Sequence, residues 1–145
     1  MEQTRVDMIR RINYLTKEID GLYHQAALKF KMSDAVSIVL YNIYDMGEDC
    51  LLSDIYKNTG ISRQTVNSAI RKLEADGILY LEPYSGRAKR IVLTEKGRDY
   101  VEHTAARIFR AEMAALDSWT EEEIRTYIAL IEKDLTCMRR EIDKL

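Results

Sequence analysis

The sequence has little of the residue types that usually carry catalysis or bind metal. Among 145 residues there are only two histidines, His24 and His103, and they lie far apart. No H-E-x-x-H, G-x-S-x-G or phosphate-binding glycine loop is present. Two scattered histidines do not make a zinc site, although abundant carboxylates keep a metal-responsive protein as a minority alternative. The sequence therefore predicts no enzyme, no catalytic residues, no metal site and no cofactor.

Cysteine is also scarce. Cys50 and Cys137 are distant from each other and form no C-x-x-C pattern, which favours two reduced thiols over a disulfide. Cys50 directly follows Glu48 and Asp49, whose carboxylates disfavour a thiolate. We therefore expect Cys50 to be a packed side chain and a poor peroxide-sensing nucleophile.

Long hydrophobic runs are missing too. The longest, around residues 35 to 41, is interrupted by Ser37 and falls short of the ~18 residues that span a bilayer. The first residues, Met-Glu-Gln-Thr-Arg-Val-Asp, lack the apolar stretch of a signal peptide. Hydrophobic residues make up 46% and charged residues 32% of the chain. We expect a cytoplasmic globular protein with no membrane partner.

A helix-turn-helix pattern lies between residues 53 and 77. Ser53 is placed to cap a short helix, Gly60 to end it in the left-handed conformation, and Ser62 to cap a second helix. The inward apolar stripe of this second helix consists of Val66, Ala69, Ile70 and Leu73. Its outer side, called here the reading face, consists of Gln64, Asn67, Ser68 and Arg71. Amides and arginines match base edges in a major groove, so we predict a recognition helix.

A basic hairpin is predicted directly after this helix. Gly77 ends the helix, and residues 78–81 and 90–93 have strand character. The residues that interrupt the strand pattern are Pro83, Ser85 and Gly86. The basic residues near the tip of the hairpin are Arg87, Lys89 and Arg90. A hairpin with a basic tip at this position is a wing, which can reach phosphates or a minor groove.

The charge distribution agrees with DNA binding. Residues 57 to 98 contain nine basic and four acidic residues, a net charge of +5, whereas the whole chain has a net charge of -2. A basic module within an acidic remainder is typical of a DNA-binding domain.

Both ends of the chain carry apolar residues at heptad spacing. We expect a first helix over residues 4–30, a second capped by Ser33, one long helix from Thr94 to about Leu116, and a last helix that begins with a capping box at Thr120. The N-terminal stripe consists of Ile12, Leu15, Ile19, Leu22 and Ala26. The C-terminal stripe consists of Ile124, Ile128, Ile131, Leu135, Met138, Ile142 and Leu145. These stripes favour a two-fold homodimer, and pairing of the two stripes within one chain is the alternative.

Several motifs resemble the MarR family of winged-helix regulators. They are Thr59-Gly60-Ile61-Ser62, Thr65-Val66, Arg71-Lys72-Leu73-Glu74, Gly77-Ile78-Leu79 and the stretch from Gly86 to Gly97, GRAKRIVLTEKG. Two positions depart from the family pattern. Ser85-Gly86-Arg87 stands where the wing usually has Asp-x-Arg, and Ser37 stands where an aromatic residue is common.

The resemblance implies a mainly α fold with a small β-hairpin wing and long N- and C-terminal dimerisation helices. The winged helix-turn-helix would span residues 33–93, and residues 1–32 and 94–145 would form the helical dimerisation region. Relatives are transcriptional regulators, often repressors, that bind palindromic double-stranded DNA as homodimers. Small aromatic or phenolic effectors, bound between the winged helix and the dimerisation helices, often alter their affinity for DNA.

We predict DNA contacts from both the recognition helix and the wing, and we leave the residues of any ligand site unassigned. The predicted DNA-binding residues are Arg63, Gln64, Thr65, Asn67, Ser68, Arg71, Arg87 and Lys89. A winged helix can also bind protein, so a protein-interaction module is the alternative. The two functions differ in salt dependence, because phosphate contacts make DNA affinity fall steeply as salt rises.

Overall fold

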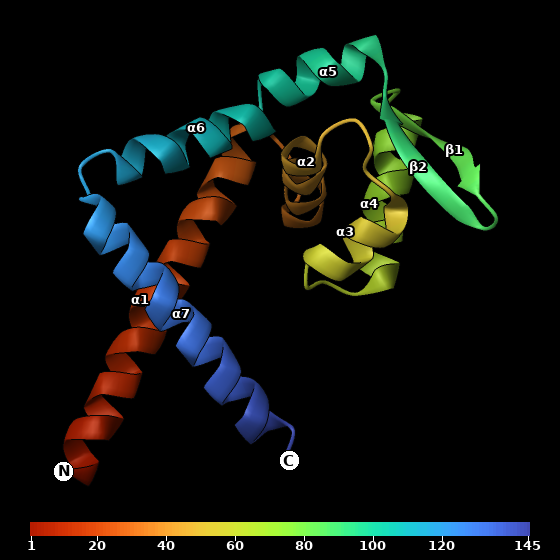
Figure 1. The fold of residues 1–145 in the computed structure, drawn as a ribbon. Helices are drawn as coiled ribbons and strands as arrows, with labels where there is room; N and C mark the ends of the chain where they lie inside the picture. Colours follow the sequence, from red (N-terminus) through yellow and green to blue (C-terminus); the bar gives the residue numbers. More distant parts are fainter. The chain divides into compact units, whose positions relative to one another are not determined.

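The computed structural model describes residues 1–145 as a mainly helical chain with one two-stranded antiparallel sheet (Figure 1). The elements in order are α1 (Glu2–Lys29), α2 (Asp34–Met46), α3 (Leu52–Asn58), α4 (Arg63–Ala75), β1 (Leu79–Ser85), β2 (Ala88–Leu93), α5 (Glu95–Glu102), α6 (Ala105–Leu116) and α7 (Glu121–Ile142). The chain divides into two compact units, residues 1–108 and 109–145. None of the helices combines the length and hydropathy needed to cross a bilayer.

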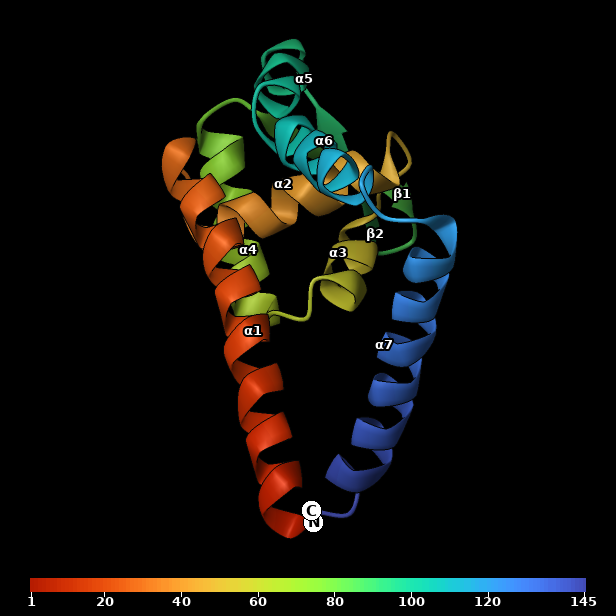
Figure 2. The same ribbon diagram turned by 90° about the vertical axis from the view of Figure 1, so that its left-hand side faces the viewer.

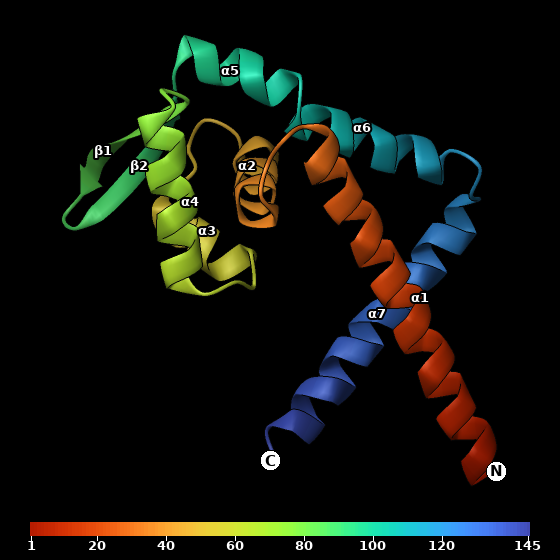
Figure 3. The same cartoon turned by 180° about the vertical axis from the view of Figure 1, so that it is seen from behind.

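The core of the first unit joins α2, α3, α4 and the hairpin. Its largest fully buried side chains are Leu40, Ile55, Leu73, Val39, Val66 and Cys50. Figure 3 shows α4 between the hairpin and α2, and α3 packs against both α4 and β2. This arrangement is a winged helix-turn-helix, as predicted.

Most predicted helix starts are confirmed. The hydroxyl groups of Ser33, Ser62, Thr94 and Thr120 accept hydrogen bonds from backbone N–H groups in the first turns of α2, α4, α5 and α7. At Thr120 the capping box is complete, because the Glu123 carboxylate accepts from the Thr120 N–H at 2.9 Å. These hydrogen bonds lower the pKa of the Glu123 carboxyl group.

The predicted cap at Ser53 is wrong. The helix α3 begins at Leu52, with Leu51 as its N-cap residue, so Ser53 lies inside the first turn. Residues 50 and 51 are extended because Cys50 accepts a backbone hydrogen bond from Ile91, and Leu51 forms an isolated β-bridge with Arg90. The Asp54 carboxylate then accepts from the Leu51 N–H at 3.0 Å. A contact with β2, distant in sequence, thus sets the helix start.

The prediction of one long helix from Thr94 to Leu116 is also wrong. The segment forms two helices, α5 and α6, which are separated at His103 and Thr104. No glycine or proline marks the break. Thr104 is buried, and its hydroxyl donates to the Tyr100 carbonyl at 2.7 Å, while its N–H donates to Val101. Such local bonds compete with the regular helical pattern.

The end of α4 is bonded tightly to the start of α5. Gly77, at a φ of +73°, ends α4 in a Schellman motif, in which the Ile78 N–H donates to the Leu73 carbonyl at 2.9 Å. Thr94 donates from its hydroxyl to the Gly77 carbonyl at 2.6 Å and from its N–H to the Ile78 carbonyl at 3.0 Å. A Cβ atom on Gly97 would lie 1.8 Å from the Ile78 carbonyl oxygen, so only glycine fits there.

The hairpin is longer than predicted. Strand β1 continues through Pro83 to Ser85, with an irregular register between these two residues. Pro83 was expected to end the strand. Proline has no backbone N–H, but in a two-stranded sheet an N–H that points away from the partner strand makes no hydrogen bond within the sheet, so proline is tolerated there. Gly86 and Arg87 form a two-residue turn, in which Gly86 alone has a positive φ, +55°. That pattern is typical of a type II′ turn, whose first central residue is glycine.

The apolar stripes on α1 and α7 are exposed. Figure 2 shows the unbroken course of both helices. On α1, Ile12, Ile19 and Leu22 are 56%, 46% and 60% exposed. On α7, Leu135 is 55% exposed, and the helix ends at Ile142, so Leu145 lies beyond it.

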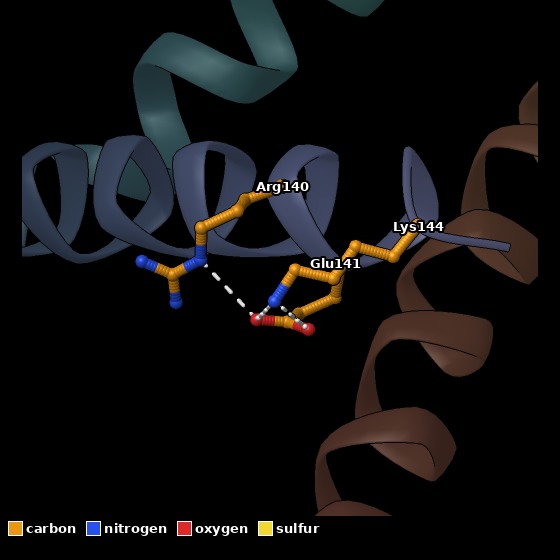
Figure 4. Close-up of polar contacts among 3 residues, drawn as sticks. All are labelled: Arg140, Glu141 and Lys144. Atoms are coloured by element: carbon orange, nitrogen blue, oxygen red, sulfur yellow. Dashed lines mark hydrogen bonds and ion pairs between the residues drawn. The ribbon is translucent and has the colours of Figure 1, made fainter.

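Polar groups bond to one another at the end of α7. Glu141 accepts from Arg140 Nε at 3.2 Å and from Lys144 Nζ at 3.0 Å (Figure 4). All three side chains are exposed, so each ion pair stabilises the helix only slightly.

Candidate nucleic-acid interface

The helix-turn-helix positions the reading face. Gly60, at a φ of +70°, follows the last residues of α3, and Ser62 starts α4 two residues later. Val66, Ala69, Ile70 and Leu73 are all buried, as the predicted inward stripe requires. Because one side of α4 is buried in the core, its opposite side faces solvent.

The free hydrogen-bonding groups on α4 belong mainly to Gln64, Ser68 and Arg71, which are exposed. Arg71 makes one long contact, from Nη2 to the Ser68 hydroxyl at 3.4 Å, and Gln64 has no hydrogen-bond partner. The Thr65 hydroxyl is 2.7 Å from the hydroxyl of the cap residue Ser62. Gln64 and Arg71 are therefore available to a partner, whereas Thr65 is partly committed to the cap.

Two other predicted DNA contacts, Arg63 and Asn67, both touch Tyr56 of α3. The Arg63 guanidinium lies over the Tyr56 ring, 4.4 Å from its centroid. The Tyr56 hydroxyl donates to Oδ1 of Asn67, which is half-buried. Tyr56 was not predicted to matter. Its side chain is partly buried, and its place on the short helix before α4 was the one available signal.

The wing carries two free cations near its tip. Arg87 lies in the turn and Lys89 in β2, and both are exposed without an ion-pair partner. Arg90, also expected at the basic tip, is instead bound to Glu82 on the paired strand and lies 3.6 Å from Asp49. The hydrogen bond with Glu82 raises the pKa of the Arg90 guanidinium, and the pair joins β1 to β2.

The cysteines and histidines have separate environments. Burial, and secondarily the Asp54 carboxylate, raise the pKa of the Cys50 thiol to about 11. The thiol is therefore neutral at pH 7, for a different reason from the predicted effect of its two acidic neighbours in sequence. His24 Nδ1 lies 2.8 Å from Asp34, and His103 Nδ1 lies 2.7 Å from the Asp99 carbonyl. No three potential metal ligands come together in the structure.

A cavity of about 310 Å³ lies between the end of α2, strand β2 and α5. Its walls include Ile43, Val92 and Val101, and its charged residues are Glu48, Arg90 and Arg98. Ser37, at the position where an aromatic residue is common in relatives, is buried elsewhere and does not line this cavity. Apolar walls with few charged groups are typical of a small-molecule site.

Comparison with known proteins gives a consistent result. A model of the MarR family matches residues 30–90. Many solved structures are similar. The S. aureus MepR structure in its DNA-binding conformation has 24% sequence identity and a TM-score of 0.74, covering 88% of this chain and 98% of that one. A putative MarR family regulator from Listeria monocytogenes, complexed with a 26mer DNA, has 19% identity and a TM-score of 0.70, covering 92% and 89%. The PcaV regulator of Streptomyces coelicolor, in complex with its natural ligand, has 17% identity and a TM-score of 0.63, covering 86% and 91%. No curated protein sequence matches the chain.

Proposed function

Because the chain belongs to the MarR family of winged-helix proteins, we propose that it is a sequence-specific DNA-binding transcriptional regulator. The observation that carries this proposal is the surface made by α4 and the wing. Gln64 and Arg71 on α4, and Arg87 and Lys89 on the wing, are exposed and have no acidic partner. Groups that match base edges and phosphates are thus exposed on α4 and the wing, without an acidic partner in the chain.

Five of the eight predicted contacts have a direct role in this part of the proposal. Gln64, Ser68 and Arg71 would reach base edges in the major groove, because they project from the exposed side of α4. Arg87 and Lys89 would contact the phosphate backbone or an adjacent minor groove. Residues 33–93 would then be the DNA-binding domain.

The regulator would act as a homodimer on a palindromic site, as a repressor. The exposed stripes support a dimer, because a helix face with several half-exposed isoleucine and leucine side chains is stabilised by burial against a partner. Residues 1–32 and 94–145 would form the dimerisation region. Two-fold symmetry would place two α4 helices in successive major grooves, about 34 Å apart.

A small ligand would release the DNA. The support for this step is the cavity between α2, β2 and α5, where Arg98 has no ion-pair partner. Apolar walls with an arginine at one side suit a small aromatic or phenolic acid. A ligand that fits only one arrangement of α5 and the wing shifts the population towards that arrangement.

A DNA-binding titration tests the proposed function. Duplexes retained by the purified protein from a random pool, together with its own upstream DNA, are measured at increasing salt concentrations. We expect a retained palindromic sequence whose affinity falls steeply with salt. If no duplex is retained at low salt, the DNA-binding proposal is wrong and a protein-docking role is favoured.

Adding benzoate or salicylate to the same titration tests regulation. We expect loss of DNA binding in the wild type and a weaker response in Arg98→Ala. An unchanged affinity for DNA with either acid, at concentrations up to their solubility, would contradict an acidic aromatic effector.

A further inference from the structure

We propose that Tyr56 is a positioning residue that turns Arg63 and Asn67 into a donor-only pair, which selects guanine in each half-site. The proposal rests on the proposed DNA-binding function and specifies what one part of the surface reads. It starts from the contacts of the Tyr56 side chain. The ring lies under the Arg63 guanidinium, and the hydroxyl donates to Asn67 Oδ1.

The bond from Tyr56 fixes which end of the Asn67 amide is free. An unconstrained asparagine offers both a carbonyl acceptor and an N–H donor, and this combination pairs with adenine. In this chain the carbonyl oxygen accepts from Tyr56, which holds it against α3, so the amide nitrogen with its two N–H donors is the group left for DNA. Asn67 held in this way can donate to an acceptor atom on a base, but it cannot form the paired donor and acceptor contacts that recognise adenine.

Arg63 adds further donors on the same side of the helix. Residues 63 and 67 are one turn apart on α4, so their side chains are neighbours. The cation–π contact holds the guanidinium plane against the Tyr56 ring, 4.4 Å from its centroid, and leaves the N–H groups at its edge free. Arginine has donors only.

The base that fits two donor groups is guanine. Guanine presents N7 and O6 as acceptors in the major groove, whereas adenine presents one acceptor and one donor, and cytosine presents a donor. The geometry therefore points to a guanine in each half-site opposite the start of α4.

The test is selection of binding sites from random duplexes with the full-length wild type and Tyr56→Phe. This change keeps the ring under Arg63 and removes only the hydroxyl, so the Asn67 amide becomes free to rotate. We expect the preference for guanine over adenine at one base pair to fall by roughly tenfold, because one bidentate contact discriminates by this order. Tyr127→Phe, which makes the same chemical change on α7, is the control and should leave the selected sequence unchanged.

A double-mutant comparison separates positioning from a merely structural role. Asn67→Ala should abolish the preference at the same base pair, and Tyr56→Phe added to it should cause no further change in preference. If Tyr56 only stabilised the fold, Tyr56→Phe would lower the melting temperature and leave every base preference intact. That result would overturn the proposal.

Failure of the inference differs from failure of the proposed function. A wild type that retains no duplex overturns both. A wild type that selects a palindrome without guanine opposite α4, or with base preferences that Tyr56→Phe does not change, overturns the inference alone. NMR adds a measurement without DNA: the Asn67 side-chain amide should be rigid in the wild type and mobile in Tyr56→Phe, and equal mobility would also overturn it.

Discussion

Helices α4 and α7 have the same kind of periodicity and opposite surroundings. On α4 the apolar residues are buried, with Val66 fully inaccessible, and the exposed side is polar. On α7 the apolar residues Ile128, Ile131 and Leu135 are about half exposed. The pattern of a sequence therefore gives the face of a helix that needs a partner. It does not say whether that partner lies in the same chain.

A charge placed in each apolar stripe tests whether α4 and α7 differ in where their partner lies. Leu73→Asp puts a carboxylate at a position that is 2% exposed in the core of the winged helix. We expect the free energy of unfolding to fall by about 4 kcal/mol, from lost burial and an unpaired buried charge. Denaturant unfolding followed by circular dichroism measures the change. Ser68→Asp, on the exposed side of α4, is the control and should leave the fold intact.

The same change on α7 should affect assembly instead of folding. We expect Leu135→Asp to weaken dimerisation by roughly 100-fold or more, because each subunit would bury a charge at the two-fold interface. Analytical ultracentrifugation measures the mass. Lys133→Asp, on the other side of α7, should remain a dimer. A Leu135→Asp protein with unaltered mass would show that this stripe is not the interface.

A smaller effect is expected on the exposed side of α4. Arg71→Ala should weaken specific DNA binding by roughly 10- to 100-fold, the range for loss of one base contact, with no change in dimer mass. Fluorescence anisotropy with the selected duplex measures the affinity. Lys72→Ala is the matched control, because the Lys72 ammonium already pairs with Asp76 at 3.2 Å. Equal affinities of the Arg71→Ala and wild-type proteins would remove Arg71 from the interface.

The smallest effect concerns the wing. Arg87→Ala should lower affinity by roughly threefold for every duplex and reduce the slope of affinity against salt by about 1, because one phosphate contact is lost. Salt titrations of the specific duplex and an unrelated one give both values. Relaxed preference at a single base position, with an unchanged slope, would instead assign Arg87 to base recognition.

Much of the winged helix could be predicted because its signals are local. A serine or threonine hydroxyl meets N–H groups in the same turn, and Gly60 takes up a left-handed conformation that depends only on its own backbone. The inward stripe of α4 follows from helical spacing.

Two of the wrong predictions depend on contacts between residues far apart in sequence. The start of α3 is set by a bridge to β2, and β1 continues through Pro83 because its partner strand is in place. Within the candidate site, the exposed groups of α4 were predictable from their positions around the helix axis. The contribution of Tyr56 was not, because it requires α3 and α4 to be packed against each other.

The joint at Gly97 has a mechanical consequence. The Ile78 carbonyl oxygen occupies the space where a Cβ atom of residue 97 would lie, and Thr94 is hydrogen-bonded to Gly77 directly after α4. Helices α4 and α5 are therefore closely joined. We therefore expect a tilt of α5 to move α4 with it. We expect bending instead further along the chain, at His103 and Thr104, where the helix is interrupted.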